Sequence, residues 1–136
     1  MTIQRTLILL KPDAVERQLV GAILSRFEQK GLKLIEMRWF RFTPELARCH
    51  YAEHVGKAFY AGLEEYITSG PVIAVVLEGL DAVEVVRRLI GPTNGAEAPP
   101  GTIRGDFSLS NQRNLVHASD SPASALREIK IFFPTI

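Results

Sequence analysis

The chain has 136 residues, of which 46% are hydrophobic and 23% charged, and its net charge is +1. This length and composition suit one folded unit with its own core, so we expect residues 1–136 to form a single domain. A net charge near zero gives no electrostatic basis for binding nucleic acid or an anionic membrane. Cys49 is the only cysteine, which excludes an intrachain disulfide and any zinc site built on cysteines.

The first part of the chain predicts a strand, a helix and a second strand. Thr6–Leu10 is a continuous apolar run that fits a strand buried on both faces. Its four leucine and isoleucine residues are too few for a signal peptide or a membrane span, so we expect a cytoplasmic protein with no membrane partner. Apolar residues at helical spacing over 20–30, closed by Gly31, predict a helix. In Leu32–Phe42 the alternation, although imperfect, predicts a strand whose even-numbered residues share one face.

The middle of the chain predicts two helical segments, a strand and a further helix. Thr43 followed by proline is a good helix start, and helical sequence runs to about residue 52 and again over 60–68. Residues 72–77 are apolar and largely β-branched, which is the strongest strand signal in the sequence. Asp81 is a candidate N-cap for a helix that ends at Gly91.

The last part of the chain contains a long segment without periodicity, followed by a strand and a helix. Pro92–Arg113 is rich in proline and glycine, and irregular segments of this length in compact domains are usually functional or disordered. Asn114–His117 predicts a short strand. Ser119 or Ser121 is the candidate cap of a last helix that reaches about residue 132.

The predicted order of elements favours an α+β fold. Without the long loop and the last helix, the chain reads as a βαββαβ core with an inserted helical hairpin over residues 43–68. Such a ferredoxin-like sandwich has a four-stranded, mainly antiparallel sheet and packs its core helices on one face.

His117 is the first candidate for chemistry. The sequence contains neither a Gly-x-x-x-x-Gly-Lys loop nor a Gly-x-Gly-x-x-Gly turn, so any nucleotide must be held by side chains. His117 lies where the predicted strand gives way to a helix, and a neutral imidazole is a good nucleophile near neutral pH. A carboxylate or hydroxyl on the second ring nitrogen would fix the tautomer, and Glu128 and Ser119 are candidates. On composition alone, a structural histidine is the more common explanation.

Two further groups of side chains are suggestive, although each has an ordinary explanation. Lys11, Arg87, Thr93 and Arg104 offer the cations and hydroxyl that phosphoryl transfer requires, but a basic pair such as Arg87 and Arg88 is more often a solvated helix face. The second group is aromatic: Tyr51, His54, Phe59 and Tyr60. An exposed Phe59 could stack on a nucleotide base, but aromatic residues in a helical hairpin are more often packing residues.

Several separate motifs, in order along nearly the whole chain, carry a resemblance to a known family. They are Lys11-Pro12-Asp13, Tyr51-Ala52-Glu53-His54, Phe59, Thr68–Val72, Arg87, Gly91-Pro92-Thr93-Asn94, Gly101–Phe107 and Asn114–Ser121. In these features the sequence resembles the nucleoside diphosphate kinases. The resemblance implies the ferredoxin-like fold and a ping-pong enzyme that transfers a γ-phosphate from ATP to nucleoside diphosphates through a phosphohistidine on His117.

The resemblance also assigns roles to individual residues. It implies that Glu128, helped by Ser119, orients His117, and that Mg²⁺ is carried on the nucleotide phosphates without direct protein ligands. The implied nucleotide-binding residues are Lys11, Tyr51, His54, Phe59, Arg87, Thr93, Arg104 and Asn114. Among them, Lys11 and Asn114 also correspond to residues near the sugar 3′-hydroxyl, and Phe59 to the aromatic on which the base stacks.

The resemblance also bears on assembly, and the sequence departs from the family pattern at a few positions. The family forms hexamers or tetramers built from a common dimer, so a homo-oligomer is expected, with the choice between the two left open. Three residues depart from the usual pattern: Gly95 replaces a proline, and Ala14 and Ala118 each replace a glycine.

Three rival functions are compatible with parts of the sequence. They are a nucleotide-binding scaffold without activity, a histidine-phosphotransfer signalling protein, and nucleic-acid binding on a ferredoxin-like sheet. The presence of Lys11, Arg104 and His117 counts against the first, and the strand-end position of His117 counts against the second. Near-neutral charge and the lack of alternating strand aromatics count against the third.

Overall fold

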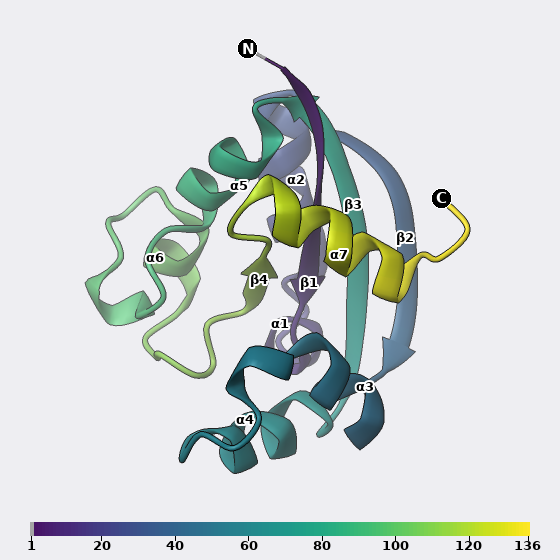
Figure 1. Ribbon diagram of the computed structural model, residues 1–136. Coiled ribbons are helices and arrows are strands. Elements are labelled where there is room, and N and C mark those ends of the chain that lie inside the picture. The colour runs from purple at the N-terminus through teal and green to yellow at the C-terminus, as the bar shows by residue number, and fades with distance from the viewer. Residues whose placement is uncertain (1) are drawn as a thin grey trace.

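The structure is a computed structural model that describes residues 2–136. Its four strands form one antiparallel sheet in the order β2-β3-β1-β4. The strands are β1 (Ile3–Leu10), β2 (Lys33–Arg41), β3 (Pro71–Leu80) and β4 (Val116–Ala118). This arrangement confirms the ferredoxin-like βαββαβ sandwich, and it places the two termini of the core, β1 and β4, side by side (Figure 1).

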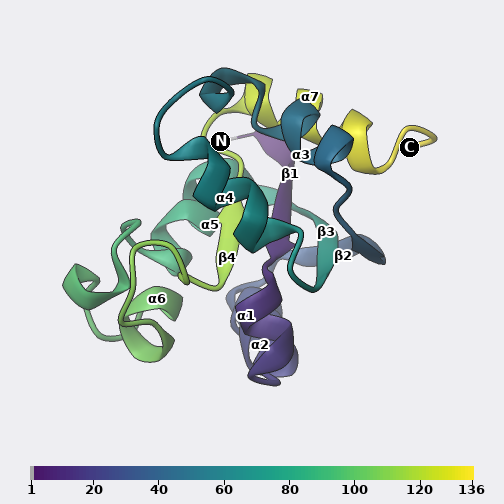
Figure 2. The same cartoon turned by 90° about the horizontal axis from the view of Figure 1, so that it is seen from below.

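Helices cover both faces of the sheet. Figure 2 shows α2 (Val20–Lys30) on one side and α3 (Pro44–His50) and α7 (Pro122–Phe132) on the other. The core helices α2 and α5 (Ala82–Ile90) bury Ile23, Phe27 and Val86 against one face, as the βαββαβ core predicts. The inserted hairpin, α3 with α4 (Tyr60–Ile67), shares the opposite face with α7. Each face therefore has its own apolar layer, which explains why Leu7–Leu10 of β1 and Val72–Leu77 of β3 are continuously apolar.

Several predicted helix ends are confirmed by their caps. The Thr43 hydroxyl accepts a hydrogen bond from the Leu46 N–H (3.1 Å), and the Ser121 hydroxyl accepts one from Ser124 (3.1 Å), so Ser121 and not Ser119 caps α7. Gly31 ends α2 with φ +107°, a conformation that glycine adopts without strain. Asp81 precedes α5, but its side chain makes no cap bond to the helix and instead accepts a bond from the Thr2 N–H.

The prediction that even-numbered residues of β2 share one face is wrong. Leu34 pairs with Leu77, whereas Glu36 pairs with Val76, so an irregularity at Ile35 shifts the register by one residue. A bulge reverses the facing of every later side chain. Leu32 and Leu34 therefore pack with α2 and α5, whereas Phe40 and Phe42 pack with α7.

The predicted irregular segment contains two short helical pieces, η2 (Gly95–Glu97) and α6 (Ile103–Phe107). Asn94 caps the first and Thr102 the second through side-chain bonds to Ala96 and Gly105. Two more short pieces were not predicted: α1 (Pro12–Glu16) directly after β1, and η1 (Ala52–His54) within the hairpin. Sequence periodicity cannot reveal such elements because each is shorter than two helical turns.

The three unusual residues fit their surroundings. Ala14 lies in α1 and Ala118 in β4, and neither has a positive φ, so neither position requires glycine. Gly95 donates its N–H to the Ser110 carbonyl (3.1 Å), a bond that proline could not make. A Cβ at this position would also lie 2.6 Å from the Ser108 carbonyl oxygen, so glycine is required here.

Within residues 2–136, none of the helices has the length and apolar character needed to cross a membrane.

Candidate active site

His117 is the central residue of β4 and is positioned by a strained turn. It pairs with Leu9 of β1, and its side chain is 23% exposed. Leu115, two residues earlier, has φ +75°, which is unfavourable for a residue with a Cβ. The Asp13 carboxylate accepts a bond from the Leu115 N–H (3.1 Å) and another from the Tyr66 hydroxyl, which clamps the turn. The entry to β4 is thereby tied to α1 and to α4 of the hairpin.

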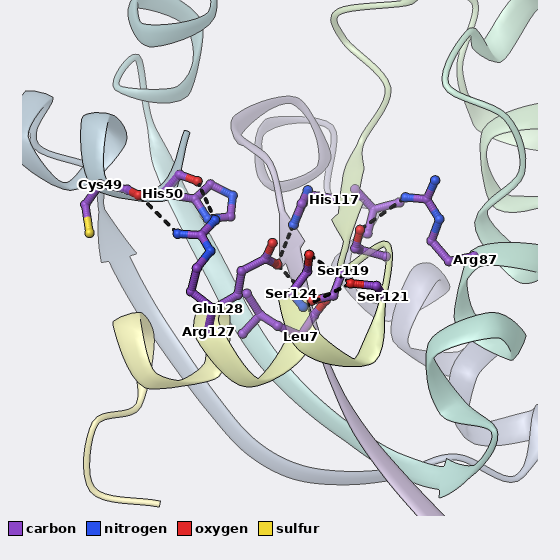
Figure 3. A network of polar contacts seen from close by, with 12 residues as sticks. Leu7, Cys49, His50, Arg87, His117, Ser119, Ser121, Ser124, Arg127 and Glu128 are labelled. Atoms are coloured by element: carbon purple, nitrogen blue, oxygen red, sulfur yellow. Dashed lines mark hydrogen bonds and ion pairs between the residues drawn. The ribbon is translucent and has the colours of Figure 1, made fainter. Parts of the chain in front are cut away.

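Glu128 holds the inner ring nitrogen of His117. The His117 Nε2 lies 2.8 Å from Glu128 Oε1, and Figure 3 shows the carboxylate reaching from α7 to the ring. The Ser119 hydroxyl donates to the same Oε1 at 2.8 Å. A carboxylate accepts hydrogen bonds only, so this contact puts a proton on Nε2 and leaves the lone pair on Nδ1. The predicted trio of His117, Glu128 and Ser119 is thus brought together.

The position of Glu128 depends on the packing of α7. Its neighbours Ile129 and Phe132 are buried against the sheet, and Phe132 lies 5.7 Å from the Phe42 ring in an edge-on arrangement. Burying a side chain of this size contributes about 1.5–3 kcal/mol, which fixes the helix and so the depth of the carboxylate.

Lys11 and Asn114 form a buried pair beside His117. The Lys11 Nζ donates to Asn114 Oδ1 at 2.8 Å, and the Asn114 amide donates to the carbonyls of Thr93 and Asn111. Burial, followed by repulsion from Arg104, lowers the pKa of Lys11 from 10.5 to about 8. An anion bound beside Lys11 therefore favours the charged form of the lysine.

Two arginines line the same cleft as His117. The Arg104 guanidinium donates to the carbonyls of Gly91, Asn114 and Val116 at 2.6 to 3.2 Å. These bonds occupy three of its five N–H groups and lock it against β4, leaving two for a ligand. Burial, and then Arg87, lower its pKa from 12.5 to about 10. Arg87 itself donates to the Ala118 carbonyl at 3.2 Å, so both cations are oriented by the strand that carries His117.

An aromatic wall leads outward from His117. The rings of Tyr51 and His54 lie 6.3 Å apart, and those of His54 and Phe59 lie 5.4 Å apart. Phe59 is 55% exposed, with Lys57 Nζ 5.9 Å from its ring centre. A large exposed aromatic ring at the end of such a wall is available for stacking, so the packing explanation of Phe59 does not hold.

One cleft of about 290 Å³ gathers most of these side chains. Of the eleven residues predicted from the sequence, nine line it: Lys11, Tyr51, His54, Arg87, Thr93, Arg104, Asn114, His117 and Glu128. Ser119 is fully buried behind His117, and Phe59 stands outside the cleft at the end of the aromatic wall. The cleft is rich in positive charge, which suits a polyanionic ligand.

His50 was missed by the sequence analysis. It ends α3, is only 4% exposed, and its ring lies 4.8 Å from that of His117 in an edge-on arrangement. Burial and nearby positive groups, His117 first among them, hold the pKa of His50 well below its usual value. Its position directly before Tyr51 in the hairpin was the available signal. Arg127, Glu53 and Asp120 also line the cleft and were not predicted.

Comparison with known proteins gives matches over nearly the whole chain. The sequence model of a family described as "Nucleoside diphosphate kinase" matches residues 4–136. Nucleoside diphosphate kinases from Rhodopirellula baltica and Staphylothermus marinus are 60% and 59% identical to the chain, covering 96% and 98% of it and 86% and 94% of their own lengths. The solved structure of a halophilic nucleoside diphosphate kinase from Halobacterium salinarum, in complex with CDP, is 48% identical with a TM-score of 0.94. It covers 97% of this chain and 88% of its own.

Proposed function

The chain belongs to the nucleoside diphosphate kinase family, and from this premise we propose a ping-pong transfer of the γ-phosphate through His117. The donor is a nucleoside triphosphate, mainly ATP, and the acceptor a nucleoside diphosphate. The observation that carries the proposal is the 2.8 Å contact between His117 Nε2 and Glu128, because it leaves the Nδ1 lone pair free for attack.

The reaction has two balanced half-steps. In the first, Nδ1 forms a bond to the γ-phosphorus while the bond from that phosphorus to the bridging oxygen breaks, releasing a nucleoside diphosphate. The imidazole becomes positively charged, and Glu128 at 2.8 Å stabilises that charge. In the second, a terminal phosphate oxygen of the acceptor attacks the phosphorus and the N–P bond breaks, which restores neutral His117.

The cations of the cleft provide the electrostatic part of catalysis. Phosphoryl transfer depends on positioning and on neutralising charge, and we assign this to Lys11, Arg87 and Arg104 with the hydroxyl of Thr93. Arg87 and Arg104 are already oriented by backbone carbonyls, so little reorganisation is needed when phosphate binds. Donor and acceptor bind to these same residues in turn, because both react with His117 in the same cleft.

Nucleotide recognition is expected to be broad. We assign base stacking to Phe59, with Tyr51 and His54 lining the path to the phosphates. Stacking tolerates any base because every base has a π-face, so several nucleotides serve as substrates. Lys11 and Asn114, joined at 2.8 Å, are assigned to the sugar 3′-hydroxyl. The CDP bound by the halophilic relative supports a nucleoside diphosphate as one substrate.

Mg²⁺ is the metal that the proposed reaction uses. Glu53 and Asp120 line the cleft in addition to Glu128, and Mg²⁺ usually combines one or two carboxylates or waters with substrate phosphates. The other charged residues of the lining are cationic and repel a free metal ion. The lining therefore fits an ion that enters the cleft bound to the nucleotide phosphates. When bound, the ion supplies neutralisation of the phosphate charge.

We also propose that the protein is a cytoplasmic homo-oligomer. β2 is an edge strand, and Met37 and Trp39 on it are 53% and 63% exposed. Exposed apolar residues on an unpaired edge favour association with another copy. Light scattering after gel filtration tests this: the wild type is expected to have the mass of several chains and Trp39→Glu a smaller one. A monomeric wild type contradicts it.

The histidine relay is tested with ATP labelled at the γ-phosphate, in the presence of Mg²⁺ and without an acceptor. The wild type is expected to take up an acid-labile, alkali-stable label, and His117→Ala to take up none. Wild-type protein that binds nucleotide tightly but remains unlabelled would contradict the proposal and favour a nucleotide-binding scaffold.

A further inference from the structure

Three side chains from distant parts of the chain converge at the floor of the cleft. His50 ends α3, His117 is in β4 and Glu128 is in α7. Each offers one ligand atom, and these three atoms all lie within 4.8 Å of one another. Two imidazoles and a carboxylate are a donor set that Zn²⁺ takes in proteins with an open fourth position.

His50 makes this more than a chance cluster. Neither of its ring nitrogens has a hydrogen-bond partner among residues 2–136, although the side chain is almost fully buried. Leaving buried polar atoms unpaired costs about 1–3 kcal/mol each, so an occupant that satisfies at least one of these nitrogens is expected. Rings of Phe42, Tyr51 and Phe132 pack around His50 and hold it against His117. The phosphoryl relay itself assigns no task to His50.

We propose that His50, His117 and Glu128 bind one Zn²⁺ ion in the unphosphorylated protein, and that this ion blocks the relay. Tetrahedral coordination with Zn–N bonds of about 2.0 Å requires ligand atoms about 3.3 Å apart. The cluster reaches this spacing if the more distant atoms approach by about 1.5 Å, which side-chain rotation can supply. A water molecule or a phosphate oxygen takes the fourth position.

The surrounding charge makes the site selective. Lys11, Arg87 and Arg104 line the same cleft and repel a cation, and the carboxylates of Glu53 and Asp120 in the lining offset only part of that repulsion. Mg²⁺ prefers oxygen ligands and gains little from imidazole, so the repulsion excludes it. Metals that bond strongly to imidazole nitrogen offset the repulsion, and among them Zn²⁺ stands high in the affinity order for nitrogen ligands. The Mg²⁺ needed for phosphoryl transfer therefore does not compete for these three residues.

Occupancy of the site stops phosphorylation for a chemical reason. A neutral imidazole has one basic lone pair, because its second ring nitrogen carries the proton. A metal bound to either nitrogen of His117 uses that pair, so no nucleophile remains to attack phosphorus. This consequence rests on the proposed function, whereas binding of the metal does not.

Binding is measured first, on the nucleotide-free protein, by titrating Zn²⁺ in competition with a chromophoric chelator. The wild type is expected to bind one ion per chain. His50→Phe keeps an aromatic ring in the aromatic pocket and removes the ligand nitrogens, and we expect it and Glu128→Gln to bind at least about tenfold more weakly. Matched controls are Cys49→Ser and His54→Ala, which remove the neighbouring alternative ligands and are expected to change the affinity less than about twofold. Circular dichroism verifies that each variant is folded.

Inhibition is measured next, as the rate of phosphohistidine formation from Mg-ATP at buffered free Zn²⁺. Each variant is compared with its own metal-free rate. The wild type is expected to lose most of its rate and to recover it when a chelator is added but not when Mg²⁺ is raised. His50→Phe is expected to resist the same Zn²⁺ concentration, and the isolated phosphoprotein to bind no Zn²⁺.

The outcomes separate the two proposals. A wild type that forms phosphohistidine but binds no Zn²⁺, or a His50→Phe variant that binds it as tightly as the wild type, overturns the metal site alone. A wild type that binds one Zn²⁺ through His50 but forms no phosphohistidine without the metal overturns the proposed function and leaves the site standing.

Discussion

Replacing Glu128 by glutamine tests how the structure activates His117. The change keeps the shape of the side chain and removes its charge, while the amide oxygen can still accept from Nε2 and from Ser119. With charge centres about 4 Å apart and an effective dielectric constant of about 20, a full charge on the imidazole gains about 4 kcal/mol from the carboxylate. A transition state with about half of that charge loses about 2 kcal/mol, or about 30-fold in rate.

The assay for Glu128→Gln is a single turnover with labelled Mg-ATP, which separates phosphorylation from nucleotide binding. We expect the rate of phosphohistidine formation to fall by about 30-fold, and the ATP concentration for half-maximal rate to remain unchanged. Glu128 acts from behind the ring, so it should affect the chemical step only. Glu84→Gln is the matched control, because this glutamate is exposed and lies on α5, paired with Arg88.

A double-mutant cycle with Ser119→Ala strengthens this test. Ser119 acts on His117 only through Glu128, by the 2.8 Å bond to its Oε1, so the two effects should not add. A loss below about threefold in Glu128→Gln, or a loss found only in nucleotide affinity, would refute the reasoning. Thermal melting of each variant shows whether a lower rate reflects unfolding.

Three other substitutions make independent predictions. The pKa of Lys11 is about 8 in the folded protein and 10.5 in the unfolded chain, so kcat/KM for Mg-ATP should fall as pH rises through 8. Between pH 8 and pH 10.5 the unfolded chain binds more protons than the folded protein, so the free energy of unfolding rises with pH by up to about 3 kcal/mol. Urea unfolding of Lys11→Met should lack this rise. Phe59→Ala should weaken binding of all nucleoside diphosphates alike, by about 1–3 kcal/mol in calorimetry, and a loss confined to one base would contradict stacking. Gly95→Ala should lower the free energy of unfolding by about 1–3 kcal/mol, and with it the urea midpoint, because the added Cβ meets Ser108. An unchanged midpoint would show that the loop shifts to make room for the Cβ.

The sheet and most of the site could be predicted because their signals are local in sequence. β3 is apolar over its central residues, and α7 begins at a serine followed by proline, so strand and helix are evident without any partner. The motifs around His117 and Lys11 point to candidate site residues that the structure brings into one cleft. The strand order then follows from the few connections that a βαββαβ chain allows.

The features that were missed depend on contacts between distant segments. The bulge at Ile35 in β2 follows from packing against β3 and both helical layers, and no residue type marks it. His50 looks like an ordinary residue at a helix end until α3 folds over β4 and α7. The strained Leu115 is held by Asp13, about a hundred positions away in the chain, so its conformation has no local cause.

The most direct test of the central claim is whether the phosphohistidine is a true intermediate. Wild-type protein is phosphorylated with labelled Mg-ATP, freed of nucleotide, and mixed rapidly with GDP in a quenched-flow instrument. Label is expected to leave His117 and to appear in GTP at least as fast as steady-state turnover, and dTDP and CDP are expected to be phosphorylated as well. Label that stays on the protein, or transfers more slowly than turnover, would contradict the relay through His117.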